Sequence, residues 1–169
     1  YGGMWRRNGR PPQQLCGVGF SAQGKHIGDP YRRTDASYDP KYAWVFEGIN
    51  EELLGNFGFS GGGAAGFELD RADPRLGTPR NAVVLASSEG HGDHFGLVPE
   101  EILMTNILTW NGEPYDDLIR ADIVYFETSN GGAVFSVGSI TYCGCLPYNN
   151  CDNNISRMTA NILNYFLRH

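Results

Sequence analysis

The sequence predicts an α/β domain that is rich in β-strands and loops and ends in one amphipathic helix. Glycine accounts for 23 of the 169 residues, about 14% against an average near 7%, which favours turns and close backbone approaches over long helices. Two β-rich runs flank a turn signal at residues 129–132, and the segment 151–169 carries apolar side chains at helical spacing.

Length and charge limit the classes of protein to consider. The chain is long enough for one domain with its own core, so we treat residues 1–169 as a single unit. The net charge is −6 and the 13 basic residues do not gather along one segment, which disfavours nucleic-acid binding. No apolar run approaches the roughly 18 residues that a membrane span requires. The sequence therefore predicts neither a nucleic-acid partner nor a membrane partner.

The first half of the chain reads as short strands between loops. Residues 1–40 are expected to be loop-rich because prolines interrupt them, with one short strand and glycine breaks over 14–24. Residues 42–49, "YAWVFEGI", have the composition of a strand. Residues 81–90 predict another strand, an apolar run that ends in small and polar side chains. Residues 99–110 fit either a short helix or a bent strand.

The second half contains the clearest local patterns. Residues 121–140 predict a β-hairpin, because β-rich runs lie on either side of Ser-Asn-Gly-Gly at 129–132. Residues 151–169 predict an amphipathic helix that Asp152 or an adjacent asparagine can cap. Its apolar stripe consists of Ile155, Met158, Ile162 and Phe166.

The stretch "FGFSGGGAAGFELDR", residues 57–71, satisfies the dinucleotide pattern G-x-G-x-x-G. A dinucleotide loop needs a strand before it and a long helix after it, and Pro74 and Pro79 prevent such a helix here. Two interpretations remain. The glycines form a turn or bulge where backbones pack closely, or they leave room beside Glu68 for a substrate or a second domain.

Glu68 lies between Phe67 and Leu69, and on a strand its side chain points away from both. If these two neighbours face the core, Glu68 faces a surface or a cleft. If Glu68 instead faces inward, its carboxylate is removed from water and suited to proton transfer.

A second group of polar residues follows the predicted strand at 81–90. The segment "SSEGHGDHFG" brings Glu89, His91, Asp93 and His94 close together in sequence. Metal binding, contact between the substrate and His91 or Asp93, and hydrogen bonds within the loop all remain open.

The sequence gives weaker support to a catalytic serine or cysteine and to a special role for the thiols. Ser60 in "GFSGG" only approximates the G-x-S-x-G elbow and no helix follows it, and Cys143 has no obvious base nearby in sequence. The four cysteines are expected to be structural thiols, with a zinc site or disulfides as alternatives. The tyrosines Tyr31, Tyr38 and Tyr42 are expected to be packed with their hydroxyl groups hydrogen-bonded.

Several longer stretches resemble one known family. They are "YGGMWRRNGRPPQQLCGVGFSAQG", "WVFEGI", "GGGAAGFELDR", "DPRLGTP", "SSEGHGD", "NGGAVFSVGSITYCG" and "DNNISRMTANIL". Together they resemble the C-terminal part of the large subunit of N,N-dimethylformamidase and its relatives over nearly the whole chain. A start without an initiator methionine or an apolar signal segment suggests the interior of a longer polypeptide.

The resemblance implies a fold and an activity. The fold would be the closing portion of a layer like that of the class I glutamine amidotransferases. The activity would be hydrolysis of N,N-dimethylformamide to dimethylamine and formate. The cofactor would be a mononuclear non-haem iron held by two tyrosines and a glutamate outside this segment, so no metal ligand is assigned here.

The resemblance also implies a site residue and partners. Glu68 matches a glutamate near the iron that is suited to proton transfer. The partners would be the remainder of the large subunit, a small subunit and a small amide substrate, in a hetero-oligomer. The expected free thiols separately favour a cytoplasmic location. The alternative is a non-catalytic amidotransferase-like scaffold that forms a subunit interface.

Overall fold

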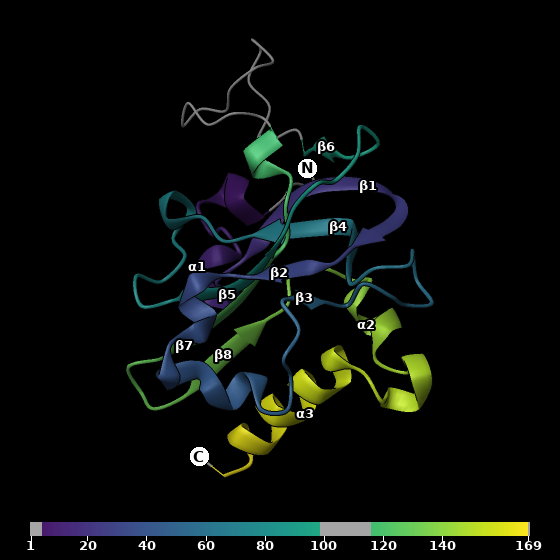
Figure 1. Ribbon diagram of the computed structural model, residues 1–169. Coiled ribbons are helices and arrows are strands. Elements are labelled where there is room, and N and C mark those ends of the chain that lie inside the picture. Colours follow the sequence, from purple (N-terminus) through teal and green to yellow (C-terminus); the bar gives the residue numbers. More distant parts are fainter. Residues whose placement is uncertain (1–4, 99–115, 169) are drawn as a thin grey trace.

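The structure is a computed structural model that describes residues 5–98 and 116–168. Within these residues the strands form two antiparallel sheets (Figure 1). The first sheet has the order β4-β1-β6 and consists of β1 (Gly19–Asp29), β4 (Ala65–Arg71) and β6 (Gly96–Leu97). The second has the order β3-β2-β5-β7-β8 and consists of β2 (Tyr31–Arg33), β3 (Leu53–Leu54), β5 (Val83–Ser88), β7 (Asp122–Glu127) and β8 (Ala133–Ser136).

The helices are short except for the last one. The α-helices are α1 (Gln13–Cys16), α2 (Tyr142–Cys145) and α3 (Asn154–Phe166). The 3-10 helices are η1 (Trp5–Asn8), η2 (Asp35–Tyr38), η3 (Pro40–Phe46), η4 (Pro74–Leu76), η5 (Asp116–Leu118) and η6 (Tyr148–Cys151). The prediction of a mixed α/β chain, rich in strands and loops and ending in a helix, is confirmed.

The glycine-rich stretch forms a close contact between backbones. A Cβ atom on Gly28 would lie 2.3 Å from the carbonyl oxygen of Gly63, and one on Gly63 would lie 2.3 Å from the carbonyl oxygen of Gly28. A Cβ on Gly66 would lie 2.4 Å from the carbonyl oxygen of Ile27. Any side chain at these positions would collide with backbone, which confirms the interpretation as a site of close packing.

The second sheet contains the elements that were clearest in the sequence. β5 lies within the strand predicted at 81–90, and β7 and β8 form the predicted hairpin. The hairpin turn closes through the Thr128 amide, which donates to the Gly132 carbonyl at 2.7 Å, while Gly131 adopts φ +83°.

One local prediction fails, one is confirmed in part and one cannot be compared. Residues 42–49 were expected to form a strand, but 40–46 form η3, because Pro40 favours a helical start and the Asp39 carboxylate accepts from the Lys41 amide at 2.8 Å. The strand expected at 14–24 is replaced at its start by α1 and begins only at Gly19. The segment 99–110 lies outside the described residues.

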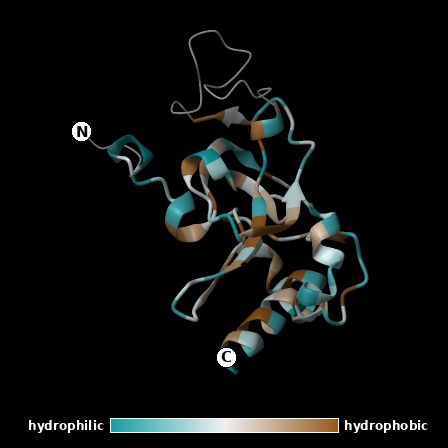
Figure 2. Ribbon diagram, turned by 90° about the vertical axis from the view of Figure 1, so that its left-hand side faces the viewer, coloured by the Kyte–Doolittle hydropathy of each residue, from teal (hydrophilic) through white to brown (hydrophobic). Residues whose placement is uncertain are grey.

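The C-terminal helix covers the core from one side. Ile155, Met158 and Ile162 are buried, and Phe166, the last member of the predicted stripe, is 39% exposed. Figure 2 shows hydrophobic and hydrophilic residues alternating along this helix. The side chain of Asn153 caps it by accepting from the Ser156 amide at 2.9 Å. The predicted amphipathic helix is confirmed.

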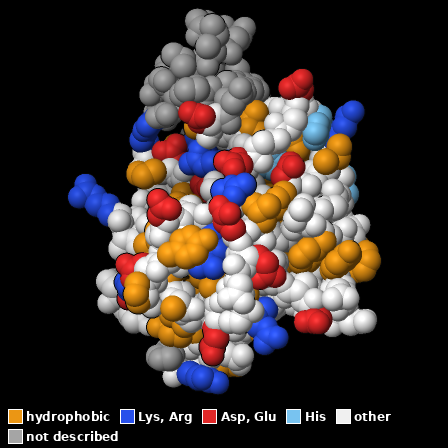
Figure 3. All heavy atoms as spheres, in the orientation of Figure 1, with side chains coloured by type: hydrophobic (Ala, Val, Ile, Leu, Met, Phe, Trp, Pro, Cys, Tyr) orange, Lys and Arg blue, Asp and Glu red, His pale blue; other side chains and the backbone are white. Residues whose placement is uncertain are grey.

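The described surface is mixed in charge. Acidic and basic side chains are interspersed over the face seen in Figure 3. None of the helices in the described part of the chain combines the length and the apolar character that crossing a membrane requires.

We expect Gly63→Ala to destabilise the fold by about 1–3 kcal/mol, because an added methyl group in a packed interior forces the backbone to shift. Urea unfolding of the two proteins measures this difference. The matched control is Gly62→Ala, since a Cβ there meets nothing within 4 Å and adds only the strain of φ +80°. Unchanged stability in Gly63→Ala would show that close packing at Gly63 is not the constraint.

Candidate functional site

Glu68 lies on β4 opposite Gln23 of β1, within the three-stranded sheet. Leu69 is fully buried and Glu68 is half-buried. Because successive side chains alternate on a strand, the carboxylate points away from the core that receives Leu69. This matches the prediction that Glu68 faces a surface or a cleft.

The backbone next to Glu68 is unusual. Phe67 adopts φ +64°, a conformation that costs a non-glycine residue about 1–3 kcal/mol and occurs preferentially at functional sites. The ring of Phe67 meets the edge of His26, with centroids 5.6 Å apart. On the other side, Ser139 Oγ accepts from the Gly66 amide and lies 2.8 Å from the Gly66 carbonyl oxygen. The contacts of Gly66 and Phe67 therefore fix the backbone immediately before Glu68.

A second carboxylate accompanies Glu68. Asp70 is two residues further along β4, so both side chains lie on the same face. Burial and the nearby charge of Glu68 raise the pKa of Asp70 to about 6, while Arg6 opposes the change. This face of β4 therefore presents two carboxyl groups, and Asp70 releases its proton at a higher pH than an ordinary aspartate does.

His91 is the centre of a different polar chain. Its Nε2 lies 2.7 Å from Ser88 Oγ, and its Nδ1 lies 2.9 Å from Asp29 Oδ2. The first contact is a hydrogen bond, whereas the second has the distance of an ion pair but not the alignment of a regular hydrogen bond. Ser88 Oγ also accepts from the Ala121 amide at 2.8 Å. The row of contacts from Asp29 through His91 to Ser88 connects the end of β1 to the end of β5.

Burial keeps the His91 ring neutral. Its side chain is 1% exposed, and removal from water lowers the pKa of His91 below 6.5 even though the charge of Asp29 acts in the opposite direction. With Nε2 accepting the hydroxyl proton of Ser88, the ring proton is assigned to Nδ1, on the side of Asp29.

A pocket of about 540 Å³ lies next to this chain, between the end of β5 and residues 117–120. Ser88 borders the pocket but is 1% exposed, and its hydroxyl group is already engaged by His91 and Ala121. The arrangement is therefore suited to joining the two sheets more than to nucleophilic attack.

The other predicted candidates are more dispersed. Asp93 is exposed on the loop after His91, and His94 packs against Phe95 with ring centroids 4.9 Å apart. Among residues 5–98 and 116–168, no group of three or more His, Cys, Asp or Glu side chains is placed to hold a metal ion. The substrate contacts predicted for His91 and Asp93 stay predictions.

The nucleophile candidates considered in the sequence do not form triads. Ser60 lies 2.9 Å from His26 Nε2 on an exposed part of the surface, and Cys143 is an exposed thiol. The Asp29–His91–Ser88 chain was missed because Asp29 is remote in sequence, and only strand pairing brings it near. All four cysteines are free thiols, of which Cys145 is buried and donates to the Phe57 carbonyl at 2.8 Å.

Comparison with known proteins gives the family of this chain. Residues 1–153 match the family model described as "N,N-dimethylformamidase beta subunit-like, C-terminal". The chain belongs to this family. Two curated relatives, the N,N-dimethylformamidase beta subunits of Alcaligenes sp and Paracoccus aminophilus, are each 41% identical over 168 residues. That alignment covers 99% of this chain and 22% of each relative, so the chain spans about a fifth of the length of the curated relatives it matches.

The comparisons correct the subunit assignment. The sequence was assigned to the large subunit of N,N-dimethylformamidase, whereas both relatives and the family description carry the name of the beta subunit. The assignment to a large subunit is therefore replaced by assignment to the beta-subunit family. The short motifs that carried the resemblance contain no information on how the subunits are named.

We expect the free energy of unfolding to fall as the pH drops below about 6.5, because unfolded His91 binds a proton there while folded His91 resists it. His91→Gln removes this contribution, so its stability depends less on pH than that of the original chain, by up to about 1.4 kcal/mol per pH unit. Urea unfolding at a series of pH values gives both curves.

The matched control for this titration is His26→Gln, which removes an exposed histidine and should keep the original pH dependence. Parallel stability curves for the original chain and His91→Gln would contradict a buried, neutral His91.

Proposed function

We propose that this chain forms part of an amide hydrolase that converts N,N-dimethylformamide, or a related small amide, to dimethylamine and formate or the corresponding acid. The 41% identity to two N,N-dimethylformamidase beta subunits over nearly the whole chain carries this proposal. In this assembly the chain supplies part of the active-site wall, and Glu68 is the residue that transfers protons.

The position of Glu68 supports this role. Hydrolysis of an amide requires a group that takes a proton from water and a group that protonates the leaving amine. A half-buried carboxylate on a strand face, with the strained backbone of Phe67 before it, can do both in turn. The glycine contacts at Gly28 and Gly63 bring two backbone segments together beside this part of the sheet.

The residues described here do not form the iron site that the family resemblance implies. Tyr31 is fully buried and its hydroxyl group donates to the Val137 carbonyl, and Tyr42 is also buried. No described cluster of His, Cys, Asp or Glu fits a metal ion either. We therefore derive no step through iron, and the expectation that its ligands belong to other parts of the assembly stays a prediction.

The remaining expectations concern the wider assembly. We infer that the partners are the rest of the beta subunit, because the curated relatives extend well beyond the matched region, and a second subunit, because those relatives are named as beta subunits. The cytoplasmic location stays a prediction. The amidotransferase-like layer also stays a prediction, since the strand pairs of the described residues are antiparallel.

A second candidate function is that of a scaffold at a subunit interface. Trp5 and Leu15, both more than two-thirds exposed, favour it, because they line one hollow together and exposed apolar groups that lie together mark contact surfaces. In this alternative all of the chemistry takes place elsewhere in the assembly.

Glu68→Gln separates the two functions. In the assembled enzyme that contains this chain, we expect the variant to retain assembly and unfolding behaviour and to lose about 10²–10⁴-fold in kcat, the usual contribution of a proton-transfer group. Steady-state hydrolysis of N,N-dimethylformamide, followed by release of dimethylamine, measures the loss.

The matched control is Glu47→Gln, which removes an exposed carboxylate beyond η3 and should leave kcat unchanged. Near-normal turnover of Glu68→Gln would remove the catalytic assignment and favour the scaffold.

A further inference from the structure

The face of β4 that carries Glu68 also carries Asp70. Two residues on one face of a strand are about 6.6 Å apart along it, within the range of direct electrostatic interaction. Leu69 between them is fully buried on the opposite face, and its carbonyl accepts from Ser21 Oγ at 3.0 Å. The strand therefore holds the two carboxyl groups in a fixed relation to each other.

The backbone of Asp70 is closely packed against the segment after β8. Its amide donates to the Gly138 carbonyl at 2.8 Å. A Cβ on Gly138 would lie 2.6 Å from the carbonyl oxygens of both Asp70 and Asp122. This close approach of the segment after β8 fixes the backbone of Asp70, and burial partly removes its carboxyl group from water.

The charged and titratable groups around Asp70 favour its protonated form. Glu68 on the same strand adds a like charge, and Arg6 of η1 provides a partial counter-charge. From β2, the Tyr31 hydroxyl is buried nearby and its proton is engaged by the Val137 carbonyl. Burial and the charge of Glu68 outweigh Arg6, which raises the pKa of Asp70 from 3.8 to about 6.

We propose that Glu68 and Asp70 act as a single proton-sharing pair, in which Glu68 is the base and Asp70 is the acid. This inference rests on the proposed amide hydrolysis and assigns a role to a residue that the family motif did not mark. The charge of Glu68 is one cause of the raised pKa of Asp70, so the proton on Asp70 depends on its neighbour along the strand.

The pair allows both proton transfers to be made from one face. Ionised Glu68 takes a proton from the attacking water as the new C–O bond forms. Protonated Asp70 gives its proton to the amide nitrogen as the C–N bond breaks, which releases the amine and the acid. The pair still holds one proton at the end, and its return from Glu68 to Asp70 restores the starting state.

The first test uses the 169-residue chain and does not depend on activity. Carbon-13 NMR of the side-chain carboxyl groups gives the titration of Asp70 directly. We expect a midpoint near pH 6, and in Glu68→Gln a shift towards the usual aspartate value of about 3.9, since one cause of the elevation is gone. Glu47→Gln is the control and should leave the midpoint in place. An Asp70 midpoint that does not respond to Glu68→Gln would overturn the pair.

The second test uses the assembled enzyme and the pH dependence of kcat. An acid that must be protonated makes kcat fall as the pH rises through its titration. We expect Asp70→Asn to lose this fall and to reduce kcat by at least tenfold, and Asp70→Glu to restore part of both. A purely structural role of Asp70 would change stability but not the shape of the profile.

The outcomes separate this inference from the proposed function. If Glu68→Gln abolishes turnover while Asp70→Asn leaves the pH profile unchanged, the pair is refuted and Glu68 acts alone. If neither substitution alters turnover, the proposed function itself fails, whatever the NMR titration shows. If Asp70→Asn does not fold, Asp70→Glu and the NMR titration of Asp70 in the unaltered chain decide.

Discussion

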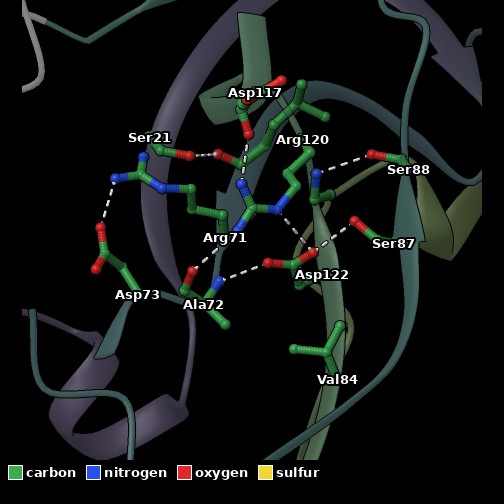
Figure 4. A network of polar contacts seen from close by, with 12 residues as sticks. Ser21, Arg71, Ala72, Asp73, Val84, Ser87, Ser88, Asp117, Arg120 and Asp122 are labelled. Carbon is green, nitrogen blue, oxygen red and sulfur yellow. Dashed lines mark hydrogen bonds and ion pairs between the residues drawn. The ribbon is translucent and has the colours of Figure 1, made fainter. Parts of the chain in front are cut away.

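The arrangement of the two sheets depends on one buried carboxylate. Asp122 at the start of β7 is 1% exposed. It accepts hydrogen bonds from the Ala72 amide at 2.8 Å, from Ser87 Oγ at 2.7 Å and from Arg120 Nε at 3.2 Å (Figure 4). A buried carboxylate is costly unless it is paired and hydrogen-bonded, so any displacement of these donors is opposed strongly.

The hydrogen bonds to Asp122 connect the two sheets, because their donors belong to different sheets. Ala72 directly follows β4 of the first sheet, whereas Ser87 belongs to β5 and Asp122 to β7 of the second. Asp122 therefore fixes the end of the strand that carries the two proposed proton-transfer groups. The neighbouring ion pair between buried Arg71 and Asp73, 2.8 Å long, holds the turn that continues from it.

Glycines complete this constraint by allowing backbones to meet without side chains. At Gly138 the carbonyl oxygens of Asp70 and Asp122 come so close that a Cβ would collide with both. At Gly28 and Gly63 a similar close contact between backbones lies at the other end of the β1–β4 pair. The high glycine content thus reflects close packing around one face, and no nucleotide loop is required to explain it.

The sequence predicted elements that are stabilised locally and missed those that depend on distant partners. The hairpin of β7 and β8 and the helix α3 follow from turn and periodicity signals that lie within each segment. Residues 42–49 are an exception, because the cap at Asp39 and Pro40 that favours a helical turn is itself a local signal, and the strand-like composition was given more weight.

The same distinction applies to the candidate site. Glu68 was found from its motif, and alternation along "FELD" could have placed Asp70 beside it, since the same reasoning had already separated Glu68 from Leu69. The raised pKa of Asp70 requires burial of its carboxyl group in the folded chain, and the contact of His91 with Asp29 requires the pairing of β2, which follows Asp29, with β5, which precedes His91. No local pattern contains either contact.

The most direct test of this account is hydrogen exchange in Asp122→Asn, because loss of one partner in a buried charged network costs about 3–5 kcal/mol. If Asp122 fixes β4 against the second sheet, NMR should show that the amides of Ala72 and Asp70 lose more protection than those of α3. The control Asp117→Asn, at an exposed carboxylate nearby, should match the original chain. An equal loss in β4 and α3, or no loss at Ala72, would contradict the claim that this carboxylate positions the site.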